Sequence, residues 1–134
     1  LGQSDSKILV DAENASLDAN GNLDVATIVA GRSINTQTGT TYTFVLADRL
    51  KIVTLNNSSA ITLTIPPNSS VAFAVGTSID IIQLGAGQVT VAGGSGVTVN
   101  STPTLKLRAQ DSVGSCLKIA TDTWVAMGNH GGVS

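Results

Sequence analysis

The chain of 134 residues is long enough for one compact domain with an extension. Only 12% of its residues are charged, against roughly 25% in an ordinary soluble domain, so its surface must consist largely of Ser, Thr, Asn, Gln and Gly. The net charge of −2 and the scattered basic residues exclude the basic stripe that nucleic-acid binding needs. No apolar run approaches the roughly 18 residues of a membrane span. We therefore expect neither nucleic acid nor a membrane as a partner.

The first 37 residues differ in pattern from the rest of the chain. Short apolar groups, ILV, LDV and IV, are separated by polar and small residues and are too sparse to form a core. We expect residues 1–37 to be an extended N-terminal arm that docks on another surface. Its candidate anchor residues are Ile8, Leu9, Val10, Leu23, Val25, Ile28 and Val29.

An oxygen-rich segment, DANGNLD at 18–24, lies within this arm. It places oxygen ligands on alternate residues, as at the start of a calcium loop: Asp18, Asn20, Asn22 and Asp24. The later positions where such a loop needs Gly and Glu hold Leu23 and Val29 instead. Asn20-Gly21 between two apolar groups is also the strongest short-range hairpin signal. We favour a hairpin turn here and keep a cation site as the alternative.

Strand signals recur from residue 38 to the end of the chain, with β-branched residues alternating against polar ones. Gly-, Asn- and Pro-rich segments separate them, and Pro66 and Pro67 end one strand because neither can donate to a ladder. We expect an all-β domain over residues 38–134, an antiparallel β-sandwich or barrel of jelly-roll type. Its expected strands are 42–46, 50–55, 61–65, 71–75, 78–84, 88–92, 96–99, 104–108, 113–120 and 123–127.

Few side chains in the chain could carry chemistry. We expect Cys116 to be a partly buried strand thiol and His130, between glycines near the C-terminus, to be a mobile surface histidine. The glycines at 85–97 alternate with β-branched residues instead of opening a helix, so they indicate turns and not a phosphate loop. Glu13 is the only glutamate, which disfavours a two-carboxylate hydrolase. We expect no enzymatic activity, no cofactor and no metal.

Several phrases, taken together, resemble a β domain that recurs in structural proteins of tailed bacteriophages. They are TYTFVLAD at 41–48, TIPPN at 64–68, VAFAVGT at 71–77, QLGAGQVT at 83–90 and TDTWV at 121–125. The likeness spans residues 38 to 128 and excludes the arm. It implies a trimeric, non-enzymatic protein of the virion exterior, made in the host cytoplasm, that belongs to a tail fibre or a related appendage.

Two assignments within this class stay open. In a tail fibre, exposed loops would contact a host-surface glycan or protein, through Asn56, Asn57, Ser58, Ser59, Asn68, Ser69, Ser70 and Ser95. In a capsid decoration (cement) protein, a trimer would sit over the capsid lattice while the arm clamped the major capsid protein. Both assignments predict a homotrimer whose other partners are virion proteins of the tail or the capsid.

Overall fold

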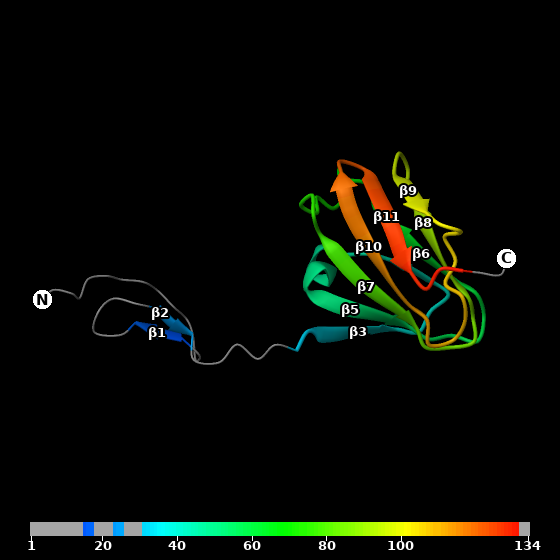
Figure 1. Ribbon diagram of the computed structural model, residues 1–134, viewed down its shortest axis with the longest axis horizontal. Coiled ribbons are helices and arrows are strands. Elements are labelled where there is room, and N and C mark those ends of the chain that lie inside the picture. Colours follow the sequence, from blue (N-terminus) through cyan, green and yellow to red (C-terminus); the bar gives the residue numbers. More distant parts are fainter. Residues whose placement is uncertain (1–14, 18–22, 26–30, 132–134) are drawn as a thin grey trace, which may run out of the picture. The chain divides into compact units, whose positions relative to one another are not determined.

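The computed structural model of the chain describes residues 15–17, 23–25 and 31–131 (Figure 1). The chain divides into two units, residues 1–31 and 32–134. In the first unit, β1 (Ala15–Leu17) and β2 (Leu23–Val25) pair antiparallel, with Leu17 opposite Leu23. This pairing is what a hairpin around Asn20-Gly21 requires. The turn itself and the possible cation ligands Asp18, Asn20 and Asn22 lie outside the described residues, as do the anchor candidates Ile8, Leu9, Val10, Ile28 and Val29.

The second unit contains two sheets. Six strands pair in the order β3-β5-β7-β10-β11-β9, and three pair in the order β4-β6-β8. The strands are β3 (Ser33–Gln37), β4 (Thr41–Thr43), β5 (Lys51–Leu55), β6 (Ile61–Ile65), β7 (Ser78–Gln83), β8 (Val89–Gly93), β9 (Thr98–Ser101), β10 (Val113–Ala120) and β11 (Thr123–Gly128), with a short 3-10 helix η2 (Leu46–Leu50) before β5.

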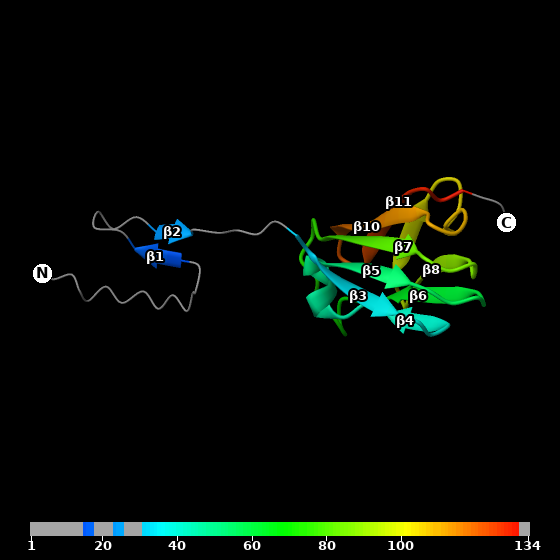
Figure 2. The ribbon, with the colours of Figure 1, turned by 90° about the horizontal axis from the view of Figure 1, so that it is seen from below.

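From β3 to β8, consecutive strands alternate between the two sheets, so this part of the chain winds in stacked coils. β3 and β4 form the first coil, β5 and β6 the second, and β7 and β8 the third, and equivalent strands pair in parallel. For example, Val53 lies opposite Ile81 in one sheet and Leu63 opposite Val91 in the other. Figure 2 shows the strands of the two sheets running side by side. β10 then pairs antiparallel with β7 and with β11, and β9 pairs parallel with β11.

The all-β expectation is confirmed, but the expected antiparallel sandwich or barrel is wrong, because the fold is a short β-solenoid of stacked coils. The physical reason lies in the turns. Gly-, Asn- and Pro-rich segments mark where a strand ends, but they do not show whether the chain returns beside the same strand or rounds a corner into the other sheet. Here the segments at 38–40, 56–60 and 84–88 are corners.

Close stacking of these corners explains two glycines. The Leu84 N–H donates to the Leu55 carbonyl at 2.7 Å, and the Gly87 N–H donates to the Asn57 carbonyl at 2.8 Å. A Cβ on Gly85 would lie 2.5 Å from the Asn57 carbonyl oxygen, and a Cβ on Gly87 would overlap the backbone of Ser59. Gly85 and Gly87 are therefore required by the approach of one coil to the next.

The core lies between the two sheets and consists mainly of aliphatic side chains. Alternate residues of β6 and β7 are buried, as expected for strands with one covered face. Phe73 and Trp124 meet edge to face, with ring centroids 5.5 Å apart. Each fully buried Val, Leu, Ile or Phe side chain contributes about 1.5–3 kcal/mol through removal from water. The largest of these buried side chains are Trp124, Phe44, Leu55, Ile61, Leu63, Ile65, Ile79, Ile81 and Leu107.

Three segments differ from the sequence-based expectation. Residues 33–37 were assigned to the arm but form β3, which pairs with β5, so the division falls after Gly31 and not after Gln37. Residues 71–75 are not a strand, because turn hydrogen bonds after Pro67 curl the chain while Phe73 enters the core. Residues 104–108 make only isolated bridges, at Lys106 and Leu107. None of the described residues belongs to a helix long and apolar enough to cross a membrane.

Candidate interaction surface

The outer face of the six-stranded sheet is the surface that stands out in the β domain. Strand register sets its side chains in rows. Ile34 lies beside Ile52, and Ile52 beside Asp80. In the next row Thr54 lies beside Ile82, and Ile82 beside Val113. The apolar members of this outer face are Ile34, Ile52, Ile82, Val113, Leu117, Ile119, Val125 and Met127.

These side chains are only partly covered by their own chain. Ile34 is 53% exposed, Val113 49%, Ile119 47% and Met127 41%, while the other four members are half-buried by their neighbours in the sheet. Parallel strands such as β3, β5 and β7 are normally covered on both faces, and large exposed apolar patches are typical of interaction sites. The outer face is therefore the candidate interaction surface of the β domain.

One polar cluster interrupts the outer face at its centre. The Asp80 carboxylate accepts hydrogen bonds from the Ser115 hydroxyl and from the Arg32 guanidinium, with which it forms an ion pair. The hydrogen bond from Ser115, followed by that from Arg32, lowers the pKa of Asp80. Both charged side chains stay partly exposed, so the pair adds direction to a contact more than it adds stability.

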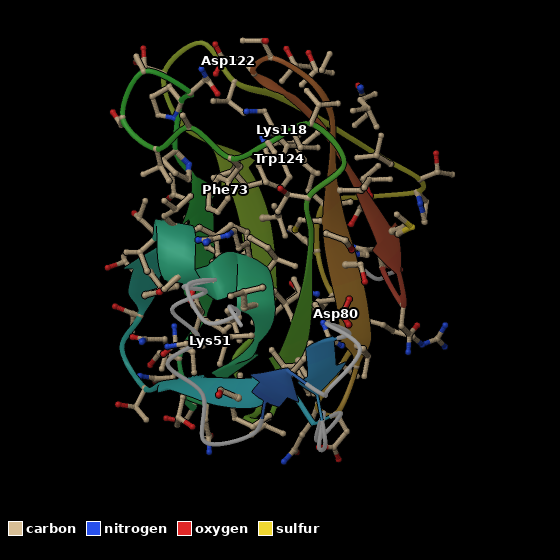
Figure 3. The ribbon with its side chains drawn as sticks, turned by 90° about the vertical axis from the view of Figure 1, so that its left-hand side faces the viewer. Lys51, Phe73, Asp80, Lys118, Asp122 and Trp124 are labelled. Carbon is tan, nitrogen blue, oxygen red and sulfur yellow. The ribbon has the colours of Figure 1, made fainter. Side chains whose placement is uncertain are left out.

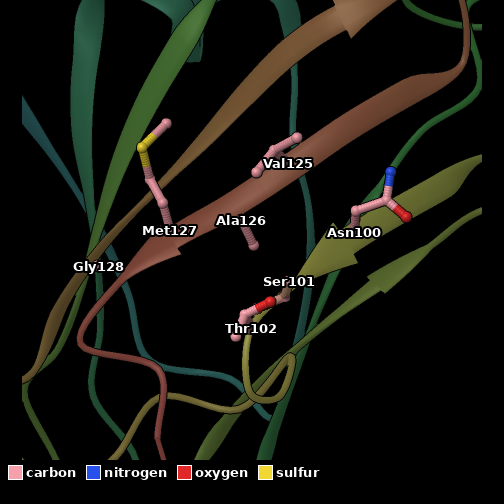
Figure 4. Close-up of a pocket in the computed structure, with 7 residues that line it drawn as sticks. All are labelled: Asn100, Ser101, Thr102, Val125, Ala126, Met127 and Gly128. Atoms are coloured by element: carbon pink, nitrogen blue, oxygen red, sulfur yellow. The ribbon is translucent and has the colours of Figure 1, made fainter.

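A groove of about 490 Å³ lies at one side of this face, between β9 and β11 (Figure 4). Its walls are neutral and mix apolar side chains with hydroxyl and amide groups. Such a lining can take an uncharged side chain or a sugar hydroxyl, but it offers no group for acid-base catalysis. The lining residues are Asn100, Ser101, Thr102, Val125, Ala126, Met127 and Gly128.

The candidate host-contact loops lie at two opposite ends of the coils. Asn56, Asn57, Ser58 and Ser59 precede β6, whereas Asn68, Ser69, Ser70 follow it and Ser95 follows β8, which runs parallel to β6. We call the end that holds residues 56–60 and the glycine corner 84–88 the Gly85 end. The end that holds Pro66, Pro67 and residues 68–70 is the Pro66 end. The structure therefore does not bring the eight residues together on one surface.

Two of the loop candidates are committed to the fold. The Asn57 side chain donates to the Thr38 carbonyl and accepts from the Ser59 N–H, each at 2.8 Å. The Asn68 side chain accepts from Lys118, and its backbone N–H donates to Asp122. The remaining candidates are exposed, namely Asn56, Ser58, Ser59, Ser69, Ser70 and Ser95.

Cys116 is fully buried on the inner face of β10, beside Ile79. Burial, with a smaller contribution from Asp80, raises the pKa of the Cys116 thiol to about 12. A thiol with this pKa is protonated at neutral pH and is a poor nucleophile. The strand location expected for Cys116 is correct, and its burial is complete where partial burial was expected.

The expectation that His130 is a mobile surface residue is wrong. His130 is 4% exposed and packs with Leu107 over Gly114, because the chain after β11 forms a bridge to residue 107. Neither ring nitrogen has a hydrogen-bond partner of standard geometry within the described part of the chain. Burial lowers the pKa of His130, and the nearby Met127 backbone offsets this only in part. The glycines beside His130 in the sequence are typical of a flexible segment, so they gave no sign of this packing.

A buried carboxylate, Asp48 in η2, was not singled out from the sequence. Tyr42 donates to it at 2.7 Å and the Asn35 side chain at 2.8 Å, while the Val45 N–H donates at 2.9 Å. Burial, and then the hydrogen bond to Asp48, raises the pKa of Tyr42 to about 12. Asp48 is thus held by neutral donors, one of them from β3, and the network fixes β3 and η2 to each other.

Residues 15–17, 23–25 and 31–131 contain no group of three or more His, Cys, Asp or Glu side chains that could hold a metal ion.

The sequence contains a signal for the outer face, although it needs the strand register to be interpreted. In SIDIIQL, Ile79 and Ile81 are buried in the core, while the opposite face of the strand carries Asp80 and a further isoleucine, Ile82, so both faces of the strand are partly apolar. Only the pairing of β7 with β5 and β10 shows that Ile82 joins Val113 on one surface. Ile34 was missed because its strand was assigned to the arm.

No protein-family model matches this chain, and no curated protein matches it either.

Proposed function

We propose that this protein is a non-enzymatic structural protein of a tailed-bacteriophage virion, displayed on the particle exterior as a trimeric domain of a tail fibre or appendage. The assignment to phage virions comes from the sequence phrases between residues 38 and 128. The proposed assembly is supported by one structural observation above the others, the apolar outer face of the six-stranded sheet. A second copy of the same chain is the proposed occupant of that face.

The chemistry of the β domain suits this role. Stacked coils give ladders in which each strand is paired on its neighbours, and such solenoids present extended surfaces. Edge strands that stay open favour pairing with other chains. The low charge content leaves a neutral, hydroxyl-rich set of exposed loops, which fits contact with a glycan or a protein of the host surface. The number of three subunits is an expectation from the resemblance.

The second candidate function is a capsid decoration protein. The observation that favours it is the division after Gly31, since a unit separate from the β domain is what an anchoring segment would require. In this case residues 1–31 would bind the major capsid protein, and the β domain would be the displayed part. The anchoring residues within the described ranges would be Leu23 and Val25 of β2.

The two candidates differ in where the protein lies on the particle. Antibodies raised against the β domain, applied to purified phage particles and viewed by electron microscopy with gold labelling, distinguish them. Label on the tail supports the fibre, and label spread over the head supports decoration. Particles that carry no label, together with a preparation in which mass spectrometry finds none of the chain, would contradict both.

A further inference from the structure

Lys118 is a buried amine that has no carboxylate partner among the described residues. It lies on the inner face of β10, next to Cys116 in the alternation, and is 2% exposed. Its Nζ donates to the Asn68 side-chain oxygen at 2.6 Å and to the Phe73 carbonyl at 2.7 Å. Within the described residues the ion pair formed is that of Arg32 with Asp80, so no described carboxylate reaches Lys118 within salt-bridge distance. Burying an ammonium group against neutral acceptors alone is costly.

The amine and the amide are held against each other by two parts of the chain that are 50 residues apart. Asn68 follows Pro66 and Pro67, whose fixed φ angles restrict the loop, and its backbone N–H donates to the Asp122 carboxylate at 2.7 Å. On the other side, the backbone of Lys118 pairs with that of Thr77 and Gly76. Asn68 and Lys118 are therefore each held in place by hydrogen bonds of their own backbone, in addition to the bond between their side chains.

Aromatic side chains surround the Lys118 side of this pair, while Asn68 is partly exposed. Phe73 is 3% exposed and Trp124 is 1% exposed, and they meet edge to face. Trp124 is the strand partner of Lys118 in the β10–β11 ladder. Figure 3 shows Lys118 close to both rings, with Asp122 beyond it at the Pro66 end. An amine that is hydrogen-bonded to the oxygen of an amide has the proximity that converts a slow reaction between two molecules into an intramolecular one.

We propose that Lys118 and Asn68 form an intramolecular isopeptide bond. The bond that forms joins Lys118 Nζ to Asn68 Cγ, and the bond that breaks joins Cγ to Nδ2. The Lys118 ammonium first gives one proton to water, the neutral amine attacks Cγ, and the leaving nitrogen takes up one proton from Nζ and departs as ammonia, which becomes ammonium in water. A lysine ammonium and a primary amide thus become a secondary amide and one ammonium ion, so atoms, electrons and charge balance without an oxidant. The reaction moves a positive charge from the interior into water, which favours the product.

The bond would tie the loop after Pro67 to β10 at the Pro66 end. A covalent link between residues 50 positions apart restricts the unfolded chain, as a disulfide of the same span does. Such a link suits a protein exposed outside a cell, where the lone Cys116 permits no internal disulfide. It does not depend on the proposed phage function, since it follows from the geometry of the β domain.

Intact mass spectrometry of the purified full chain tests this bond. We expect a mass lower than that of the sequence by one ammonia, and a protease digest that contains one branched peptide joining the segments around Asn68 and Lys118. The Lys118→Arg and Asn68→Ala variants should show neither. The Lys106→Arg variant is the matched control, because Lys106 lies outside this site, and it should keep both.

One side reaction has the same mass change and must be separated from the bond. Asn-Gly sequences such as Asn20-Gly21 lose ammonia when they form a cyclic imide. That loss would persist in Lys118→Arg and would give no branched peptide. A wild-type chain with the full sequence mass, or an ammonia loss that persists in Lys118→Arg, would exclude the isopeptide bond. If the variants fail to fold, the branched peptide of the wild-type chain decides alone.

Discussion

The two faces of the six-stranded sheet carry similar side chains but meet different surroundings. On the inner face, Val53, Ile79 and Ile81 are fully covered by the three-stranded sheet and its connections. On the outer face, Ile34 and Val113 remain about half exposed within the described structure. The same β-branched chemistry is therefore satisfied by the chain itself on one side only. This difference supports the proposal that the outer face is a contact between subunits.

The largest effect should come from neighbouring isoleucines that face opposite sides. Ile81→Ala removes fully buried methyl groups and should lower the free energy of unfolding by about 2–5 kcal/mol. Ile82→Ala, on the outer face, should cost less than about 1 kcal/mol in the dissociated chain, and its cost should grow with protein concentration because association adds stability. Urea unfolding at two protein concentrations measures both. Equal costs that do not depend on concentration would remove the distinction between the faces.

Removal of β3 should have the next largest effect, because this strand contributes to both faces. Deletion of residues 1–31 should leave the β domain folded. Deletion of residues 1–37 also removes Ile34 from the outer face and the Asn35 donor from Asp48, and a lost hydrogen bond to a charged group costs about 1.5–3 kcal/mol. Thermal unfolding of both fragments is the measurement. Identical melting temperatures would mean that β3 adds nothing to the fold.

The correct and incorrect parts of the sequence-based prediction have one physical cause. Alternation identified β6 and β10 with their bounds, because a one-sided strand has a period of two residues. Strand direction and sheet order were not accessible, because Asn56 and Gly85 mark turns without stating which strand comes to lie beside which. The burial of His130 and Lys118 was missed for a related reason, since both depend on contacts between segments distant in sequence.

The pH dependence of stability also distinguishes the interior from the outer face, because a buried histidine resists protonation. His130 packs among buried groups and its pKa is lowered, so below the ordinary value of about 6.5 the unfolded chain binds a proton that the folded chain does not. Its contribution to stability is present in full above that pH and falls as the pH drops toward the lower folded pKa. The urea midpoint should therefore be lower at about pH 5.5 than at about pH 7.5, and His130→Gln should reduce this difference.

The pH range of the stability change separates His130 from Asp80, another group whose pKa is lowered. Asp80 has a lowered pKa as well, but a lowered carboxylate pKa acts in a more acidic range, below its ordinary value of 3.8. A stability of the wild-type chain that rises on going from neutral pH to about pH 5.5 would contradict the buried, neutral state of His130.

The smallest effects are expected in the loops, which belong to neither face. Asn56→Ala should change stability by less than about 0.5 kcal/mol, because this side chain is exposed. Asn57→Ala should cost about 0.5–1.5 kcal/mol, since its side chain holds Thr38 and Ser59. If the loop contacts a host surface, Asn56→Ala should weaken binding of the purified protein to host cells while its melting temperature stays unchanged.

Sedimentation velocity of the full chain tests most directly whether the outer face is a subunit interface. The wild-type chain should give the mass of three copies at submicromolar to micromolar concentration. Val113→Lys, which places a charge beside Ile82 in the apolar row, should give mainly single copies with an unchanged circular-dichroism spectrum. Ser69→Lys, a charge of the same kind on an exposed loop at the Pro66 end, should leave the assembly intact. A wild-type chain that stays a single copy throughout this range would contradict a subunit interface on the outer face.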